Sequence, residues 1–159
     1  MQSLLPLAAR AGARLKERGE TISIAESSSG GLLSAALLSV PGASAYFIAG
    51  AIVYTAKARV LLMDLPRESV RGMRSASEPY ALLLARTARD RFGTTWGLSE
   101  TGAAGPTGNP YGNAAGHSCM ALAGPVERAI TLETGNVDRI ENMRAFAKTA
   151  LELLLQEMS

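Results

Sequence analysis

The chain has 159 residues, of which 47% are hydrophobic and 19% charged, and its net charge is +2. This length and composition are typical of one globular domain with a substantial core. The small net charge and the aromatic content of 5% argue against a nucleic-acid surface, and no segment has the roughly 20 consecutive apolar residues of a membrane-spanning helix.

Cys119 is the single cysteine, so the chain cannot form an intramolecular disulfide. This is typical of a protein in a reducing compartment. At the N-terminus the basic residues follow the apolar ones, which is the reverse of the order in a secretory signal peptide. We therefore expect a cytoplasmic protein that binds neither membranes nor nucleic acid.

The first half of the chain alternates between helical and extended patterns. Residues 3–18 have the spacing of an amphipathic helix, and Gly19 stands where helices often end. A strand is predicted over 21–26, followed by a helix over 30–39 that Pro41-Gly42 closes. The apolar run 45–55 predicts a buried strand and residues 56–63 a short helix.

The second half adds two helices and an antiparallel pair of strands. A long helix is predicted from Ser77, a suitable N-cap, and a strand over 94–102 leads into a glycine-rich loop. Residues 117–124 and 128–135 predict two antiparallel strands around Gly124-Pro125, and 138–158 a closing helix capped by Asp138. The pattern predicts the α/β class: a three-layer α/β/α sandwich with a mixed sheet, formed as a single domain over 1–159.

Polar or glycine residues follow three of the predicted strands. Ligands of open α/β sheets bind beyond the carboxyl ends of the strands, and glycines let backbone N–H groups approach an anion closely. The sequence therefore predicts a site for a small molecule that carries phosphate, although each stretch alone is also typical of a capped turn or a loop. The three stretches are 26–31, 54–59 and 101–108.

The usual catalytic sets are largely absent. His117 is the one histidine, so a Ser-His-Asp triad would have to include it. Cys119 lies two residues further on the same predicted strand, which allows a Cys-His pair but is more typical of a small core residue. A zinc site lacks ligands, and no metal site is expected. If the protein is an enzyme, we expect its nucleophile to be a hydroxyl that is activated by a group other than histidine.

Several short motifs occur in an order that resembles a known family. They are AESSSGG, PGASAYF, VYTAKAR, SASEP, TGAAGP and a late Asp138-Arg139. Over residues 20–155 the chain resembles the C-terminal domain of the competence/damage-inducible protein CinA, whose members include stand-alone nicotinamide mononucleotide deamidases.

The resemblance implies an activity as well as a fold. The fold would be an α/β/α sandwich, commonly a homodimer. The reaction would convert nicotinamide mononucleotide and water to nicotinic acid mononucleotide and ammonia. The substrate would be this small-molecule nucleotide, and no cofactor is expected.

The resemblance also implies roles for particular residues. Ser44 matches the serine assigned as nucleophile, and Tyr54, with Lys57 or Arg59, would transfer protons. Thr101 and the backbone of Gly102, Ala103 and Gly105 would stabilise the oxyanion. The residues expected to bind the rest of the substrate, including its phosphate and ribose, are Glu26, Ser27, Ser28, Ser29, Gly30, Gly31 and Arg139.

The chain departs from the family pattern at several places, two of which concern the predicted anion-binding turn and a candidate base. Ser28 stands where the family usually has cysteine, and Arg59 stands where it usually has a lysine. An arginine cannot serve as a general base, because it stays protonated. Two alternatives therefore stay open: a nucleotide-binding domain without catalysis, and an amidohydrolase of another phosphorylated amide. An Arg59→Lys variant discriminates, since a gain in turnover would favour the deamidase class.

Overall fold

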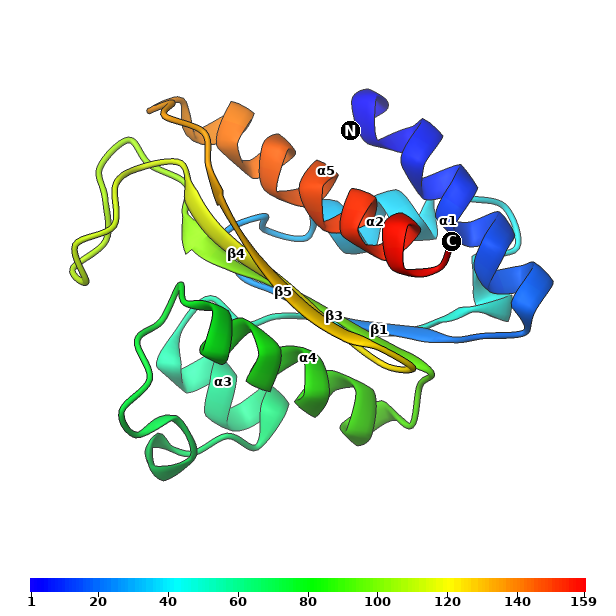
Figure 1. Ribbon diagram of the computed structural model, residues 1–159, viewed down its shortest axis with the longest axis horizontal. Coiled ribbons are helices and arrows are strands. Elements are labelled where there is room, and N and C mark those ends of the chain that lie inside the picture. Colours follow the sequence, from blue (N-terminus) through cyan, green and yellow to red (C-terminus); the bar gives the residue numbers. More distant parts are fainter.

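A computed structural model describes all residues, 1–159, and it has one five-stranded sheet. The sheet lies between two layers of helices (Figure 1). The strands are β1 (Ile22–Glu26), β2 (Phe47–Ile52), β3 (Trp96–Ala103), β4 (His117–Ala123) and β5 (Glu127–Glu133), in the spatial order β2-β1-β3-β4-β5. β1 is parallel to β2 and to β3, whereas β4 is antiparallel to β3 and to β5. The predicted α/β/α sandwich with a mixed sheet is confirmed.

The helices divide between the two faces of the sheet as Figure 1 shows. One layer contains α1 (Leu5–Arg18), α2 (Leu32–Leu38) and α5 (Arg139–Glu157), which share the largest apolar cluster with the sheet. The other layer contains α3 (Ala56–Met63) and α4 (Glu78–Phe92), which cover the opposite face. None of these helices is long and apolar enough to cross a membrane.

The predicted caps mark the ends of three helices. Gly19 ends α1 in the left-handed conformation, with a φ of 63°. Ser77 caps α4 by accepting a hydrogen bond from the N–H of Tyr80, and Asp138 caps α5 in the same way from the N–H of Glu141. These side chains satisfy N–H groups that a helix leaves unpaired at its start.

The apolar run 45–55 forms a shorter and less buried strand than predicted. β2 lies at the edge of the sheet, and its residues alternate between half-buried and exposed. Ile48 and Ile52 are 50% and 47% exposed. The prediction of a buried strand was therefore wrong. A continuous run of apolar residues occurs both in strands at the centre of a sheet and in apolar edge strands, so the pattern does not separate the two.

Candidate functional site

The carboxyl ends of β1, β2 and β3 lie at one edge of the sheet, since these three strands are parallel. The residues that follow them line two adjoining cavities of about 350 and 270 Å³. Tyr54 and Gly102 line both, so the two form one cleft. The structure thus brings together the ends of all three polar stretches that the sequence singles out.

Thr101 lies at the base of this cleft, nearly buried at the end of β3. Its Oγ1 accepts a hydrogen bond from the N–H of Ala76 at 3.3 Å. One of the two lone pairs of the hydroxyl is therefore engaged, and its own proton can be donated to a ligand. Ala76 itself has a φ of 53°, a conformation that costs a non-glycine residue about 1–3 kcal/mol and that often occurs at functional sites.

Arg139 lines one end of the cleft and forms hydrogen bonds with two other residues that line it. From the start of α5, its guanidinium donates to the carbonyl of Gly105 at 2.6 Å and to the hydroxyl of Tyr54 at 3.2 Å. Tyr54 is 60% exposed, so this contact fixes a side chain that would otherwise be mobile. Gly102, Ala103 and Gly105 line the same cavity as Arg139.

Two buried carboxylates occupy the turn between β1 and α2. Glu26 accepts hydrogen bonds from the hydroxyls of Ser29 and Ser34, at 2.6 and 2.7 Å, and from the N–H groups of Leu33 and Ser34. Glu26 has no exposed surface, so it cannot contact the ribose hydroxyl or cation that the sequence analysis assigned to it.

Glu100 accepts from the other side of this turn. Its carboxylate binds the N–H groups of Ser27 and Ser29 and the hydroxyl of Ser118. Burial raises the pKa of Glu100, and the hydrogen bonds from Ser29 and Ser118 partly oppose that rise. The turn predicted to bind phosphate thus already holds two carboxylates of the protein.

The serine turn nevertheless contributes to the cleft at two residues. Ser27 lines the central cavity and Ser28 the one beside Arg139. The hydroxyl of Ser28 is buried and has no hydrogen-bond partner in the protein. Ser29 is fully buried, and Gly30 and Gly31 line neither cavity, so these three shape the turn instead of facing a ligand.

Two predicted catalytic residues do not face this cleft. Ser44 lies on the short helix Ala43–Ala45, exposed, before β2 begins, whereas Tyr54 follows the end of β2. Six strand residues separate them, about 20 Å at 3.3 Å per residue. Lys57 is exposed on α3 and lines neither cavity, while Arg59, two residues further, does line the cleft.

His117 and Cys119 share one face of β4, as predicted, but they do not form a catalytic pair. Both ring nitrogens of His117 are engaged, Nε2 with the carbonyl of Ala76 at 2.7 Å and Nδ1 with Glu133. Burial raises the pKa of the Cys119 thiol, which disfavours the reactive thiolate. No group of three or more potential ligands could hold a metal ion.

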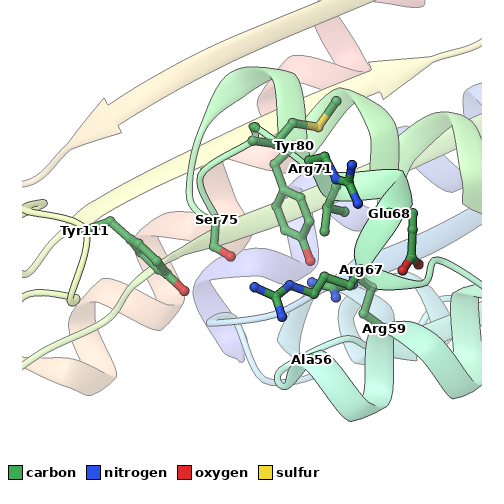
Figure 2. Close-up of a pocket in the computed structure, with 11 residues that line it drawn as sticks. Ala56, Arg59, Arg67, Glu68, Arg71, Ser75, Tyr80 and Tyr111 are labelled. Carbon is green, nitrogen blue, oxygen red and sulfur yellow. The ribbon is translucent and has the colours of Figure 1, made fainter.

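A third cavity, of about 710 Å³, adjoins the cleft and was not predicted as a whole (Figure 2). Arg59, Arg67 and Arg71 line it together with Tyr80 and Tyr111. Arg59 was a predicted site residue, but Arg67 and Arg71 were missed. A signal was present, because the segment 67–74 has three arginines and one acidic residue.

Comparisons with known proteins agree with this fold. A family model described as the CinA C-terminal domain matches residues 4–158. A CinA-like protein of Parasynechococcus marenigrum (strain WH8102) is 36% identical over 151 residues, which are 91% of this chain and 36% of the relative. Another, of Anaeromyxobacter sp. (strain Fw109-5), is 41% identical over 147 residues, or 89% of this chain and 35% of the relative. The chain spans about a third of the length of these relatives.

Solved structures give the same result. The competence/damage-inducible protein CihA of Agrobacterium tumefaciens is 28% identical, with a TM-score of 0.87 over 96% of this chain and 94% of that one. A competence or damage-inducible protein of Enterobacter asburiae is 24% identical, with a TM-score of 0.91 over 98% of each chain, a likeness of fold alone.

Proposed function

The chain belongs to the CinA C-terminal domain family, and on that premise we propose that it is an amidohydrolase that deamidates nicotinamide mononucleotide to nicotinic acid mononucleotide and ammonia. The observation that carries the proposal is the convergence of Tyr54, Thr101 and Arg139 on one cleft. These are three of the residues that the family resemblance assigns to the reaction, and they come from three distant parts of the chain.

The geometry gives each of the three a chemical role. The free proton of the Thr101 hydroxyl can stabilise the negative charge that develops on the amide oxygen during attack. Gly102 and Ala103 are paired with Ser118 and His117 in the β3–β4 ladder, so we assign the oxyanion contact to the Thr101 side chain. Tyr54, in the orientation that Arg139 imposes, would relay the proton of the attacking serine hydroxyl to the amide nitrogen, which leaves as ammonia when the C–N bond breaks.

The nucleophile needs a separate argument, because Ser44 does not reach the cleft of its own chain. We propose a homodimer that packs along the exposed edge strand β2. A two-fold axis through the middle of β2 would set the beginning of one strand beside the end of the other. Ser44 precedes β2 by three positions and Tyr54 follows it by two, so Ser44 of one copy would approach the cleft of the second. The half-exposed Ile48 and Ile52 would then be covered.

Ammonia release from nicotinamide mononucleotide tests the activity, and a mixing experiment tests the nucleophile. Ser44→Ala and Tyr54→Phe should each lose most of the activity. A refolded equal mixture should regain about a quarter of the wild-type rate, because half of the dimers then contain one intact site out of two. Ser3→Ala is the control, since Ser3 is exposed at the N-terminus, far along the chain from the cleft residues.

The other outcomes are equally informative. A fully active Ser44→Ala variant would exclude Ser44 as nucleophile and leave the unpartnered Ser28 hydroxyl as the next candidate. If the wild type releases no ammonia but the nucleotide raises its melting temperature, the domain binds nucleotides without this reaction or acts on another phosphorylated amide.

A further inference from the structure

Three arginine side chains line the cavity in Figure 2, and no ion pair neutralises their positive charge. Arg59 comes from α3, and Arg67 and Arg71 come from the segment between α3 and α4. Glu68 is the one acidic residue among the 11 that line the cavity. None of the three guanidinium groups has a carboxylate oxygen within 4.0 Å, whereas Arg86 and Arg128 elsewhere are paired with Glu127 and Glu157.

Unpaired guanidinium groups that line one concave surface repel one another, and a bound anion removes that cost. Arginine is also the side chain best suited to phosphate, because its planar donors match two phosphate oxygens at once. Arg59 is already fixed, since its Nε donates to the carbonyl of Leu65 at 3.0 Å. The two other guanidinium nitrogens of Arg59 are therefore held in place and can donate to a ligand.

Two aromatic hydroxyls complete the walls. Figure 2 shows Tyr80 and Tyr111 among the side chains around the opening. Burial raises the pKa of Tyr80, while the nearby guanidinium of Arg59 acts in the opposite direction. Tyr80 is therefore a neutral hydroxyl beside a cation, able to donate to an oxyanion. The cavity volume of about 710 Å³ lies in the usual range for small-molecule sites.

This cavity is continuous with the cleft that contains Tyr54 and Thr101. Arg59, Tyr80 and Tyr111 line both. The two other places predicted for phosphate are less suitable. The turn before α2 already holds Glu26 and Glu100, and the guanidinium of Arg139 is bound to Gly105 and Tyr54.

We propose that Arg59, Arg67 and Arg71 form the phosphate subsite, which holds the 5′-phosphate of a nucleotide while its base reaches Tyr54 and Thr101. The nicotinamide identity of the base rests on the proposed function, whereas the phosphate subsite does not. The subsite makes the domain selective for phosphorylated ligands over the corresponding nucleosides.

Calorimetric titration tests the subsite with two probes, nicotinamide mononucleotide and adenosine 5′-monophosphate, each beside its nucleoside. Arg67→Gln and Arg71→Gln should each weaken binding of the nucleotides by about tenfold, the usual effect of one charge-assisted hydrogen bond. The double variant should bind nucleotides about a hundredfold more weakly than the wild type, with Arg59 as the one arginine left in the subsite. Both arginines are exposed and without ion pairs, so these variants should fold normally.

Arg74→Gln is the matched control. It removes the same charge from the same segment, but Arg74 does not line the cavity. Its affinity for both nucleotides should change by less than about twofold, as expected for a screened surface charge. Raising the salt concentration should weaken nucleotide binding in the wild type more than in the double variant, which keeps only Arg59 in the subsite.

The results separate this proposal from the proposed function. Equal affinity of the wild type and the double variant for nicotinamide mononucleotide would overturn the subsite, even if ammonia is released. Absence of binding by both nucleotides would overturn it as well. Binding of adenosine 5′-monophosphate that depends on Arg67 and Arg71, without ammonia release, would support the subsite and refute the deamidase.

Discussion

Replacing Glu26 by glutamine is expected to destabilise the protein by about 3 kcal/mol. Each carboxylate oxygen of Glu26 accepts two hydrogen bonds, one from a serine hydroxyl and one from a backbone N–H of α2. The glutamine NH₂ group cannot accept. The hydroxyl beside it can turn and accept instead, but one backbone N–H loses its partner whichever way the amide points. A buried unsatisfied donor costs about 1–3 kcal/mol, and the remaining bonds lose their assistance by charge.

Urea unfolding measures this change, with an expected shift in midpoint of roughly 1.5 M for a slope near 2 kcal/mol per molar. Glu17→Gln is the control, because Glu17 is exposed on α1 and has no ion pair. The reasoning is refuted if Glu26→Gln leaves stability within about 1 kcal/mol of wild type but raises the KM for the nucleotide, because Glu26 would then face the ligand as the sequence analysis supposed.

Three further predictions follow from single contacts. Because the pKa of Glu100 is raised in the folded protein, its contribution to the unfolding free energy is complete below its ordinary value and is lost as the pH rises through the folded pKa. Glu100→Gln should therefore flatten the fall in stability as the pH rises above about 4.5, measured by urea unfolding; an unchanged slope would contradict the assignment. Gly97→Ala should destabilise by about 1–3 kcal/mol, since a Cβ would lie 1.9 Å from the carbonyl of Ala85; an unchanged melting temperature in thermal unfolding would contradict this. Arg59→Lys should raise KM about tenfold without raising kcat, because a lysine cannot reproduce a guanidinium that contacts both Leu65 and the ligand; a higher kcat would instead identify position 59 as the site of a base.

Features that depend on near neighbours in the chain could be predicted from the sequence. Gly19, Ser77 and Asp138 end or begin helices through contacts within four residues, so their chemistry is visible in a short window. The alternation of helices and strands and the turn at Gly124-Pro125 are local in the same sense. The order of the strands in the sheet was not predicted, and residues 45–55 were predicted as a buried strand although β2 lies at the edge, because strand neighbours are set by tertiary packing.

The candidate site was predicted where it follows directly from the ends of parallel strands, as for Tyr54 and Thr101. The site was not predicted where charged side chains from distant parts of the sequence come together. Glu100 lies 71 residues from Ser29 in the sequence, yet it takes the N–H group that a phosphate would need. Arg67 begins a short 3-10 helix, Arg67–Val70, and Arg71 follows it, but no local pattern indicates that this segment folds beside Arg59.

The buried carboxylates of Glu26 and Glu100 and the arginine side chains together determine which ligands the cleft can bind. Glu26 accepts hydrogen bonds from the N–H groups of Leu33 and Ser34 at the start of α2, so the positive end of that helix does not act on the ligand. Glu100 accepts from Ser29 in the turn before it. The cationic groups that line the cleft and its adjoining cavity are instead arginine side chains, on Arg139 at one end and on Arg59, Arg67 and Arg71 at the other. Between them lie the uncharged Tyr54 and Thr101. A ligand with a neutral amide at one end and a phosphate at the other fits this distribution of charge, whereas a free amide without phosphate would leave three guanidinium groups unpaired.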